Sequence, residues 1–252
     1  MDASSEAPEP LSTTLSDWFA TQLGRYVLER ELACFDRTVA DIFGFHAIQI
    51  GLPEYPYLAQ SRIPDRWTVD YEAPATLLAD PHWLPFPENA LDLIVLPHAL
   101  EFTEDPHRML REAYRAVRPG GQVVIAGFNP FSLFGARRYF GRGDTPPWTG
   151  NFIALYRLKD WLKLLGFEVS GGGLDCYVPP FKTEQWLRRA GFFESAGDRW
   201  WPIAGGVYFL RATKNVLGMR VITPAWQRKK RGLAAAPRQV RECIERTPVE
   251  SR

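Results

Sequence analysis

The sequence predicts a single α/β domain with a doubly wound, mostly parallel sheet, preceded by a helical extension and followed by a polar tail. Two observations predict this fold. Short apolar runs alternate with helical segments from residue 46 to residue 214, and over 91–128 a strand, a helix and a strand follow one another with short loops. Such a β-α-β unit has parallel strands and a right-handed crossover.

The composition is that of a globular protein with a substantial core, since 46% of the 252 residues are hydrophobic and 13% are aromatic. Every apolar run is shorter than the ~18 residues that cross a bilayer, and the acidic N-terminus does not resemble a signal peptide, so we expect no membrane partner. Cys34, Cys176 and Cys243 are odd in number and far apart in sequence. This favours a reducing, cytoplasmic location and argues against disulfides and a metal site.

The chain is expected to begin with a helical extension. We expect residues 1–15 to be disordered and a helix to cover 16–44, because apolar side chains recur there at helical spacing. Ser16 can cap the start of this helix. The α/β domain is then expected over 45–214.

Three short apolar runs at 47–50, 67–69 and 75–79 are the first candidate strands of the domain. The residues that directly follow these strands are Gly51, Asp70 and Asp80. Because the carboxyl ends of parallel strands meet at one edge of a sheet, we expect these three residues to lie near one another.

The clearest unit of the chain follows. "LDLIVL" (91–96) is almost continuously apolar, as expected of a central strand that is buried on both faces. Asp105 is a natural N-cap for the next helix, and Pro106 fits its first position. A Pro-Gly-Gly sequence ends that helix before a strand at 122–128.

The last elements are a helix and two strands. "LKDWLKLLGFEV" (158–169) predicts a helix that ends before Gly166 and continues into a strand, and "GGVYFLRATK" (205–214) predicts the final strand. Between them the aromatic-rich segment 179–202 is expected to contain a short helix near 183–190.

The block "LLADPHWLPFPENALDLIVLPHALEFTEDPHRMLREAYRAVRPGGQVVIAGF" (77–128) combines an acid after the third strand, "LPFPENALD" before the fourth, and an "EDP…LRE…R…RPGG" helix before the fifth. In this combination the chain resembles the class I S-adenosylmethionine (SAM)-dependent methyltransferases of the type-11 group. The resemblance implies a trimmed Rossmann-like, seven-stranded-type sheet in the order 3-2-1-4-5-7-6, with the last strand antiparallel. It also implies SAM as the cofactor.

The resemblance places the cofactor across the carboxyl ends of the first three strands, and it makes the first turn the unusual part of this chain. The acid-x-Gly-x-Gly-x-Gly run of such enzymes puts Gln49 at the acid and Gly51, Pro53 and Tyr55 at the glycines. Gln49 cannot offer a negative charge to an ammonium group, and a proline fixes φ and removes a donor. The cofactor contacts implied at this turn are Gln49, Gly51 and Leu52.

Further cofactor contacts are implied at the ends of the second and third strands. Asp70 could hold ribose hydroxyls, or it could be an ordinary turn aspartate. Asp80 would accept from the adenine amino group, or it could be a turn residue at the end of the strand. Because Pro81 has no N–H, the amide of His82 would supply the donor to the base. Only 29 residues separate Gly51 from Asp80, whereas two average helices and their strands need roughly 45. One helix of this half therefore has no room, and the other can be only a turn or two.

The end of the fourth strand, "LPHALEF", supplies the candidate catalytic residues. His98 could orient or deprotonate an acceptor, with Glu101 as a second candidate, or His98 could be a hydrogen-bonded structural histidine. "FNPF" (128–131) is interpreted as a turn. The aromatic side chains of the 179–202 segment either line an apolar acceptor pocket or pack onto the sheet; they are Trp186, Phe192, Phe193, Trp200 and Trp201.

The sequence thus predicts direct methyl transfer from SAM to a small-molecule acceptor. One alternative is a non-catalytic methyltransferase-like binding module, because the first turn is degenerate. Another is a nucleic-acid methyltransferase, because ten basic residues stand against three acidic ones from Lys214 onward in a chain of net charge +1. We expect residues 215–252 to be a disordered, solvated tail, so that nucleic acid is the less favoured partner.

Overall fold

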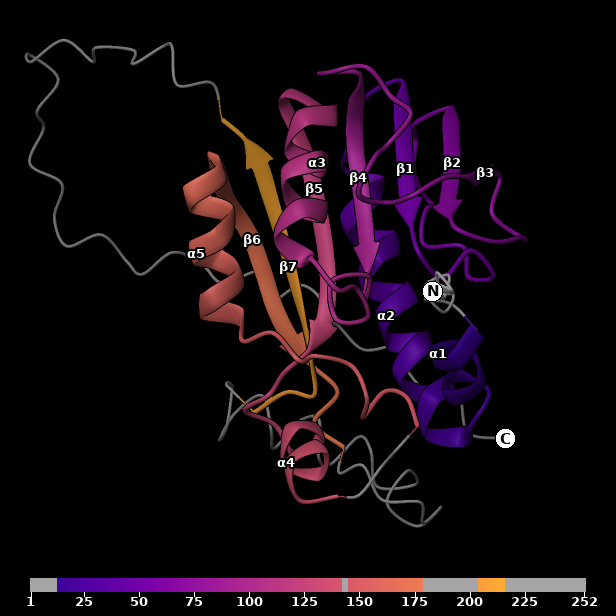
Figure 1. Cartoon of the computed structure of the whole chain (residues 1–252), viewed down its shortest axis with the longest axis vertical. Helices are drawn as coiled ribbons and strands as arrows, with labels where there is room; N and C mark the ends of the chain where they lie inside the picture. The colour runs from indigo at the N-terminus through magenta and orange to yellow at the C-terminus, as the bar shows by residue number, and fades with distance from the viewer. Residues whose placement is uncertain (1–12, 142–144, 179–203, 216–252) are drawn as a thin grey trace, which may run out of the picture.

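A computed structural model describes residues 13–141, 145–178 and 204–215 of the chain. These residues form one mixed sheet with helices on both of its faces (Figure 1). In chain order the elements are α1 (Thr13–Phe19), α2 (Gln22–Ala40), β1 (His46–Ile50), β2 (Asp65–Asp70), β3 (Leu77–Leu78), β4 (Leu91–Pro97), α3 (Pro106–Ala116), β5 (Val117–Phe128), α4 (Leu133–Phe140), α5 (Leu155–Leu165), β6 (Phe167–Asp175) and β7 (Val207–Lys214).

The sheet has seven strands in the order β3-β2-β1-β4-β5-β7-β6, as the resemblance implies. β1 pairs in parallel with both β2 and β4, so the strand order reverses between β1 and β4. β7 lies antiparallel between β5 and β6. In a sheet of this kind ligands bind outside the carboxyl ends of the strands at the point of reversal, which places the candidate site.

Alternating side chains of the central strands divide the core into two layers. Ala47 and Leu93 pack with α1 and α2 on one face, and Ile48 and Ile94 pack with α3 and α5 on the other. Figure 1 shows α3 and α5 in front of the sheet and α2 behind it. Every residue of β4 is buried, as predicted for a central strand with both faces covered.

The N-terminal extension is two helices and not the single helix predicted over 16–44. Thr21 interrupts it, because its hydroxyl caps α2 by accepting from the Gly24 amide at 3.1 Å. Ser16 accordingly lies inside α1 and is not an N-cap. A side chain at Gly24 would collide with the Trp18 carbonyl, so glycine is needed where the two helices turn against each other.

The β-α-β unit at the centre of the chain matches the prediction closely. The Asp105 carboxylate caps α3 by accepting from the Arg108 amide at 2.9 Å, and Pro106 is the first helical residue. β5 begins earlier than predicted, at Val117, because that residue already pairs with Leu91. The predicted end of the helix at the Pro-Gly-Gly sequence is wrong: α3 ends at Ala116, and Pro119, Gly120 and Gly121 lie within β5.

Other elements differ in length or were missed. β3 has only two residues, and no described helix lies between β1 and β3. The predicted shortage of chain is confirmed, but the predicted helix of a turn or two is wrong, since residues 51–64 form turns and bends. The turn predicted at 128–131 is present, but it leads into α4, which was not predicted. α5 ends before Gly166, whose φ of 99° closes the helix as expected. None of the described helices is both long enough and apolar enough to cross a membrane.

Three predictions fall on residues that the structure does not describe. These are residues 1–12 of the predicted disordered N-terminus, the short helix and aromatic side chains of 179–202, and the basic tail after Asn215; residues 13–15, predicted to be disordered, belong to α1. They stay predictions.

Candidate functional site

The carboxyl ends of the parallel strands meet at the lower edge of the sheet in Figure 1, where α1 and α4 also lie. The predicted site residues lie at the ends of β1 and β2 and in the loops at this edge, and they form three polar clusters. Gln49 lies in the first, Asp70, Asp80 and His82 in the second, and His98 with Glu101 in the third.

The Gln49 side chain holds the loop after β1 in shape. Its Nε2 lies 3.1, 2.8 and 2.9 Å from the carbonyl oxygens of Gly51, Leu52 and Tyr55, and its Oε1 accepts from the Tyr57 amide at 3.2 Å. Two amide hydrogens therefore serve three carbonyls, and none remains for a ligand. The amide hydrogens of Gln49 thus organise the loop, whereas Oε1 accepts one hydrogen bond and keeps a second lone pair, so its contact with the cofactor stays a prediction.

The turn keeps a backbone conformation that favours glycine at its first position. Gly51 has a φ of 81° and Leu52 a φ of 51°, both in the left-handed region. The Gly51 amide donates to the Val69 carbonyl at 3.0 Å, which ties the turn to β2. Tyr55, at a glycine position of the family pattern, packs edge-to-face on Phe19 of α1 with ring centroids 5.5 Å apart. The bulk of Tyr55 thus serves a contact with the N-terminal helices.

Asp70 carries the clearest sign of a ligand site. It is fully buried at the end of β2, where its Oδ1 accepts from the Tyr71 amide at 2.7 Å. Its Oδ2 is buried and has no hydrogen-bond partner among the described residues. Burial raises the pKa of this carboxyl, because the charged form loses its hydration. A buried acceptor without a donor is costly, and a ligand hydroxyl would satisfy it.

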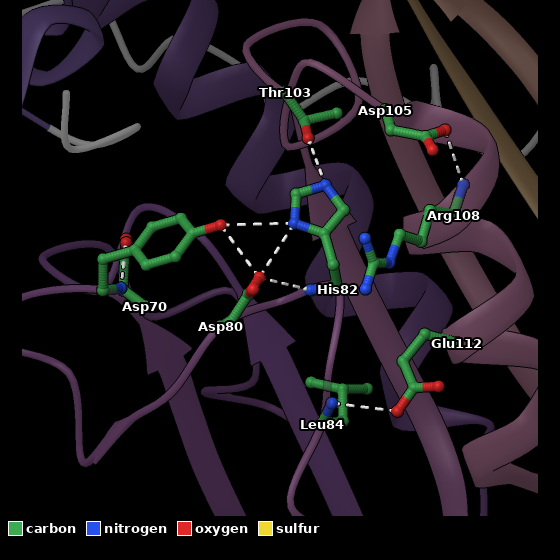
Figure 2. A network of polar contacts seen from close by, with 9 residues as sticks. Asp70, Asp80, His82, Leu84, Thr103, Asp105, Arg108 and Glu112 are labelled. Atoms are coloured by element: carbon green, nitrogen blue, oxygen red, sulfur yellow. Dashed lines mark hydrogen bonds and ion pairs between the residues drawn. The ribbon is translucent and has the colours of Figure 1, made fainter. Parts of the chain in front are cut away.

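Asp80 and His82 belong to a relay of hydrogen bonds that spans the loops after β2, β3 and β4 (Figure 2). Asp80 Oδ1 lies 2.8 Å from His82 Nδ1 and accepts from the Tyr71 hydroxyl at 2.9 Å. His82 Nε2 lies 2.7 Å from Thr103 Oγ1. Because a carboxylate only accepts, Nδ1 carries the proton in the neutral ring, and the Thr103 hydroxyl donates to Nε2.

The relay changes the role that the resemblance implies for the His82 backbone. The His82 amide donates to Asp80 Oδ1 at 2.8 Å, so it is not free to contact a base, and Pro81 has no N–H to replace it. Burial raises the pKa of Asp80, but hydrogen bonds from His82 and Tyr71 outweigh this effect and lower it overall. Asp80 therefore stays ionised, and its second oxygen accepts no hydrogen bond from the described residues.

His98 and Glu101 lie in the interior and not at an open site. His98 Nδ1 is 2.7 Å from Glu101 Oε2, and its Nε2 is 2.7 Å from Oε1 of Glu31 on α2. Glu101 also accepts from the Phe128 amide at 2.5 Å, and the Tyr57 hydroxyl donates to Glu31 at 3.1 Å. With both ring nitrogens bound to carboxylates and the side chain fully buried, the geometry argues against the predicted catalytic roles. It favours the structural alternative.

The two carboxylates of the cluster determine the charge of His98. Burial by itself disfavours the imidazolium, but the Glu31 and Glu101 carboxylates outweigh burial and raise the pKa of His98 from 6.5 to about 10. Burial raises the pKa of Glu101, because the charged form loses its hydration, and the hydrogen bond and charge of His98 offset only part of this effect. His98 is therefore a fixed cation near neutral pH, and it joins α2 to the loop after β4.

Aromatic side chains fill the space at the ends of β4 and β5. Trp18 of α1 packs edge-on against Phe128 and Phe134, with centroids 5.6 and 6.4 Å away, and Phe128 stacks on Phe152 at 5.1 Å. All four side chains are buried. A cavity of about 410 Å³ opens beside α4, and Phe152 forms part of its wall. Among the described residues no cluster of His, Cys, Asp and Glu could hold a metal ion.

Comparisons with known proteins identify the family. A family model described as a methyltransferase domain matches residues 52–125. The chain is 30% identical over 225 residues to the uncharacterised protein YafS of Escherichia coli, a match that covers 88% of this chain and 89% of YafS. The chain belongs to the SAM-dependent methyltransferases.

More distant relatives agree with this assignment. A demethylmenaquinone methyltransferase of Symbiobacterium thermophilum is 30% identical over 121 residues, which are 44% of this chain and 45% of that relative. A solved SAM-dependent methyltransferase of Thermotoga maritima superposes with a TM-score of 0.57 at 16% identity, covering 80% of this chain and 99% of the other. This structural likeness shows the same fold. The chain spans less than half of the demethylmenaquinone enzyme, and the sequence match to YafS covers nearly the whole of that relative.

Membership of this methyltransferase family implies SAM as the cofactor, and the site fits its adenosine part. The unpartnered Asp70 Oδ2 suits a ribose hydroxyl, and the free oxygen of Asp80 suits an amino group. The fit is poorer at the amino-acid end, because Gln49 is neutral and its amide hydrogens are occupied within the loop.

Sequence reasoning missed three partners in these clusters, namely Glu31, Tyr71 and Thr103. Tyr71 was open to inference as the neighbour of Asp70, whereas Glu31 and Thr103 meet their partners only in the folded chain.

Proposed function

We propose that this methyltransferase transfers the methyl group of SAM to a small-molecule acceptor. The observation that carries the proposal is the buried, unpartnered carboxylate oxygen of Asp70 at the point where the strand order reverses. A buried charge without a partner is retained against its cost where a ligand completes it. In the absence of a ligand, Asp70 is a source of instability.

When bound, SAM supplies an electrophilic methyl group on a sulfonium centre. Asp70 would accept a hydrogen bond from the ribose, and Asp80, whose position is fixed by its hydrogen bonds with His82, would accept from the base. Gln49 holds the first turn in shape through its amide hydrogens. The described residues thus bind and orient, and the rate gain comes from positioning and from exclusion of water.

Two observations support a small-molecule acceptor. The cavity beside α4, at about 410 Å³, falls within the range of roughly 300–1,000 Å³ typical of small-ligand sites, and aromatic side chains line much of it. The relative from Symbiobacterium thermophilum is named for demethylmenaquinone, a small molecule. An apolar acceptor would suit such walls.

Calorimetry with SAM and with S-adenosylhomocysteine tests the proposal. Asp70→Asn should weaken the binding of both ligands about tenfold or more, because the amide nitrogen replaces an acceptor with a donor. Asp65→Asn is the matched control, since Asp65 is the first residue of the strand that Asp70 ends, and its side chain is half exposed. The proposal would be refuted if the wild-type chain bound neither ligand at millimolar concentration, or if both variants lost affinity equally.

A non-catalytic binding module is a second candidate, favoured by one observation. Trp18 and its aromatic neighbours occupy the space at the ends of β4 and β5, where an acceptor would approach the cofactor. Incubation of the chain with methyl-labelled SAM and a metabolite extract separates the two candidates. Transfer of label that is lost in Asp70→Asn supports the enzyme, and retained SAM binding without any transfer supports the module. The nucleic-acid alternative depends on residues after Asn215, outside the described part of the chain.

A further inference from the structure

α4 and its flanks present large apolar side chains to solvent. Phe131, Leu133, Tyr139 and Phe140 are between 50% and 83% exposed, and Tyr156 at the start of α5 is 67% exposed. Phe131 and Tyr156 lie side by side, with ring centroids 6.2 Å apart. We call these five residues the α4 face. Single exposed apolar residues are ordinary, but a contiguous group marks an interaction surface.

The α4 face is held outward by the other side of the same helix. Phe134 is buried against Phe128 and Trp148, and the Ser132 hydroxyl caps the helix by accepting from the amides of Phe134 and Gly135. A side chain at Gly135 would collide with the Pro130 carbonyl, so the helix is seated closely on the preceding turn. α4 cannot roll to bury its exposed aromatic side chains without losing these contacts.

Basic residues are the charged residues of α4. The helix contains Arg137 and Arg138 and no acidic residue, Arg142 follows it, and the first acidic residue after it in sequence is Asp144. Arg138 is exposed and lies 5.4 Å from the centre of the Phe152 ring, and Arg157, next to Tyr156, is also exposed. Exposed aromatic and aliphatic side chains mixed with arginines are typical of helices that lie in the interface of an anionic bilayer.

The cavity beside α4 opens on the same face. Phe131, Tyr139 and Phe140 belong both to the α4 face and to the walls of the cavity, together with Arg138. α4 lies beyond the carboxyl edge of the sheet, at the end of the molecule that carries the candidate site (Figure 1). A surface that covered the α4 face would therefore lie against the mouth of the cavity.

We propose that the α4 face is a docking surface for lipid bilayers that contain anionic lipids. Its aromatic and leucine side chains enter the boundary between head groups and acyl chains, and Arg138 and Arg157 contact lipid phosphates. The proposal goes beyond methyl transfer and departs from the expectation of no membrane partner. A bilayer fits better than a folded protein, because α4 itself carries two arginines and no acidic residue, and this positive charge complements a uniformly anionic surface.

Co-sedimentation of the full chain with vesicles tests the proposal. Vesicles of phosphatidylcholine with phosphatidylglycerol should bind the protein, and vesicles of phosphatidylcholine alone should bind it much less. The double variant Tyr139→Ser with Phe140→Ser should lose about tenfold or more in vesicle affinity, because it removes much of the apolar surface that enters the bilayer. Arg138→Glu should weaken binding to the anionic vesicles in particular.

The matched control is the double variant Phe43→Ser with Phe45→Ser, since these side chains are comparably exposed, at 66% and 67%, but precede β1. It should bind vesicles like the wild type, and all variants should keep the wild-type melting temperature. Three outcomes overturn the proposal: no binding to anionic vesicles, unchanged binding by the Tyr139/Phe140 variant, or equal loss in the control. A wild-type dimer that only this variant dissociates would assign the α4 face to a second copy of the chain instead.

Discussion

Gln49→Glu is the most informative single substitution, because it restores the acid that the family pattern places at this position and is nevertheless expected to damage the fold. The side chain is buried, and its Nε2 faces three carbonyl oxygens of the first loop at 2.8 to 3.1 Å. A carboxylate at this position has no hydrogen to donate, so it would turn an attraction into a repulsion.

The magnitude follows from the contacts. The two lost N–H bonds account for about 1 kcal/mol each, and a buried carboxylate that faces unpaired carbonyls adds about 1–3 kcal/mol. The expected loss is therefore about 3–5 kcal/mol of unfolding free energy, a large part of the ~5–15 kcal/mol that typically holds a domain together. The loss should shrink at low pH, where the introduced carboxyl takes up a proton and regains one donor.

Urea unfolding at neutral and acidic pH measures the effect. Gln122→Glu is the matched control, because the Gln122 side chain accepts a hydrogen bond from Arg211 at 2.6 Å and a carboxylate accepts as well as an amide does. The control should be as stable as the wild type. A Gln49→Glu variant of wild-type stability at neutral pH would refute the assignment of the amide hydrogens.

Three further predictions concern stability. His98→Asn should cost about 3–5 kcal/mol at neutral pH by urea unfolding, because Glu31 and Glu101 would be left without their buried counter-ion. The raised pKa of His98 means that its stabilisation is complete below pH 6.5 and is lost as pH rises through about 10, so the variant should lack this alkaline decline. Asp70→Asn should raise the melting temperature of the ligand-free protein above pH 4, because the raised pKa of Asp70 makes its charged form destabilising; an unchanged melting temperature would contradict this. Gly24→Ala should destabilise the chain by about 1–3 kcal/mol, and a neutral result in thermal unfolding would show that the corner between α1 and α2 adjusts freely.

The sequence predicted the elements whose signals are local. Three signals are each contained in a few consecutive residues, and all three are confirmed: the buried strand β4, the Asp105 cap of α3 and the glycine after α5. The family resemblance added the strand order, which no local pattern contains. α4 was missed because its sequence is short and contains glycine and several aromatic residues, and contacts such as Phe134 with Trp148 hold it in place.

The site was predictable in position but not in the use of its side chains. Asp70 and Asp80 end neighbouring strands, so their approach follows from a parallel sheet. The occupation of the Gln49 amide depends on how the loop folds back, with Tyr57 eight residues away bonding to the same side chain. The ion pair of His98 joins residues 67 positions apart, a separation at which residue spacing carries no signal.

That separation also sets an order of events during synthesis. Glu31 leaves the ribosome well before His98. α2 therefore cannot pack with the Glu31 carboxylate buried until the residues after β4, including His98, have been synthesised. Formation of the ion pair closes a long loop of chain. The conformational entropy lost in closing this loop opposes folding before the ion pair stabilises the structure. The helices made first should therefore be among the last parts of the molecule to become fixed.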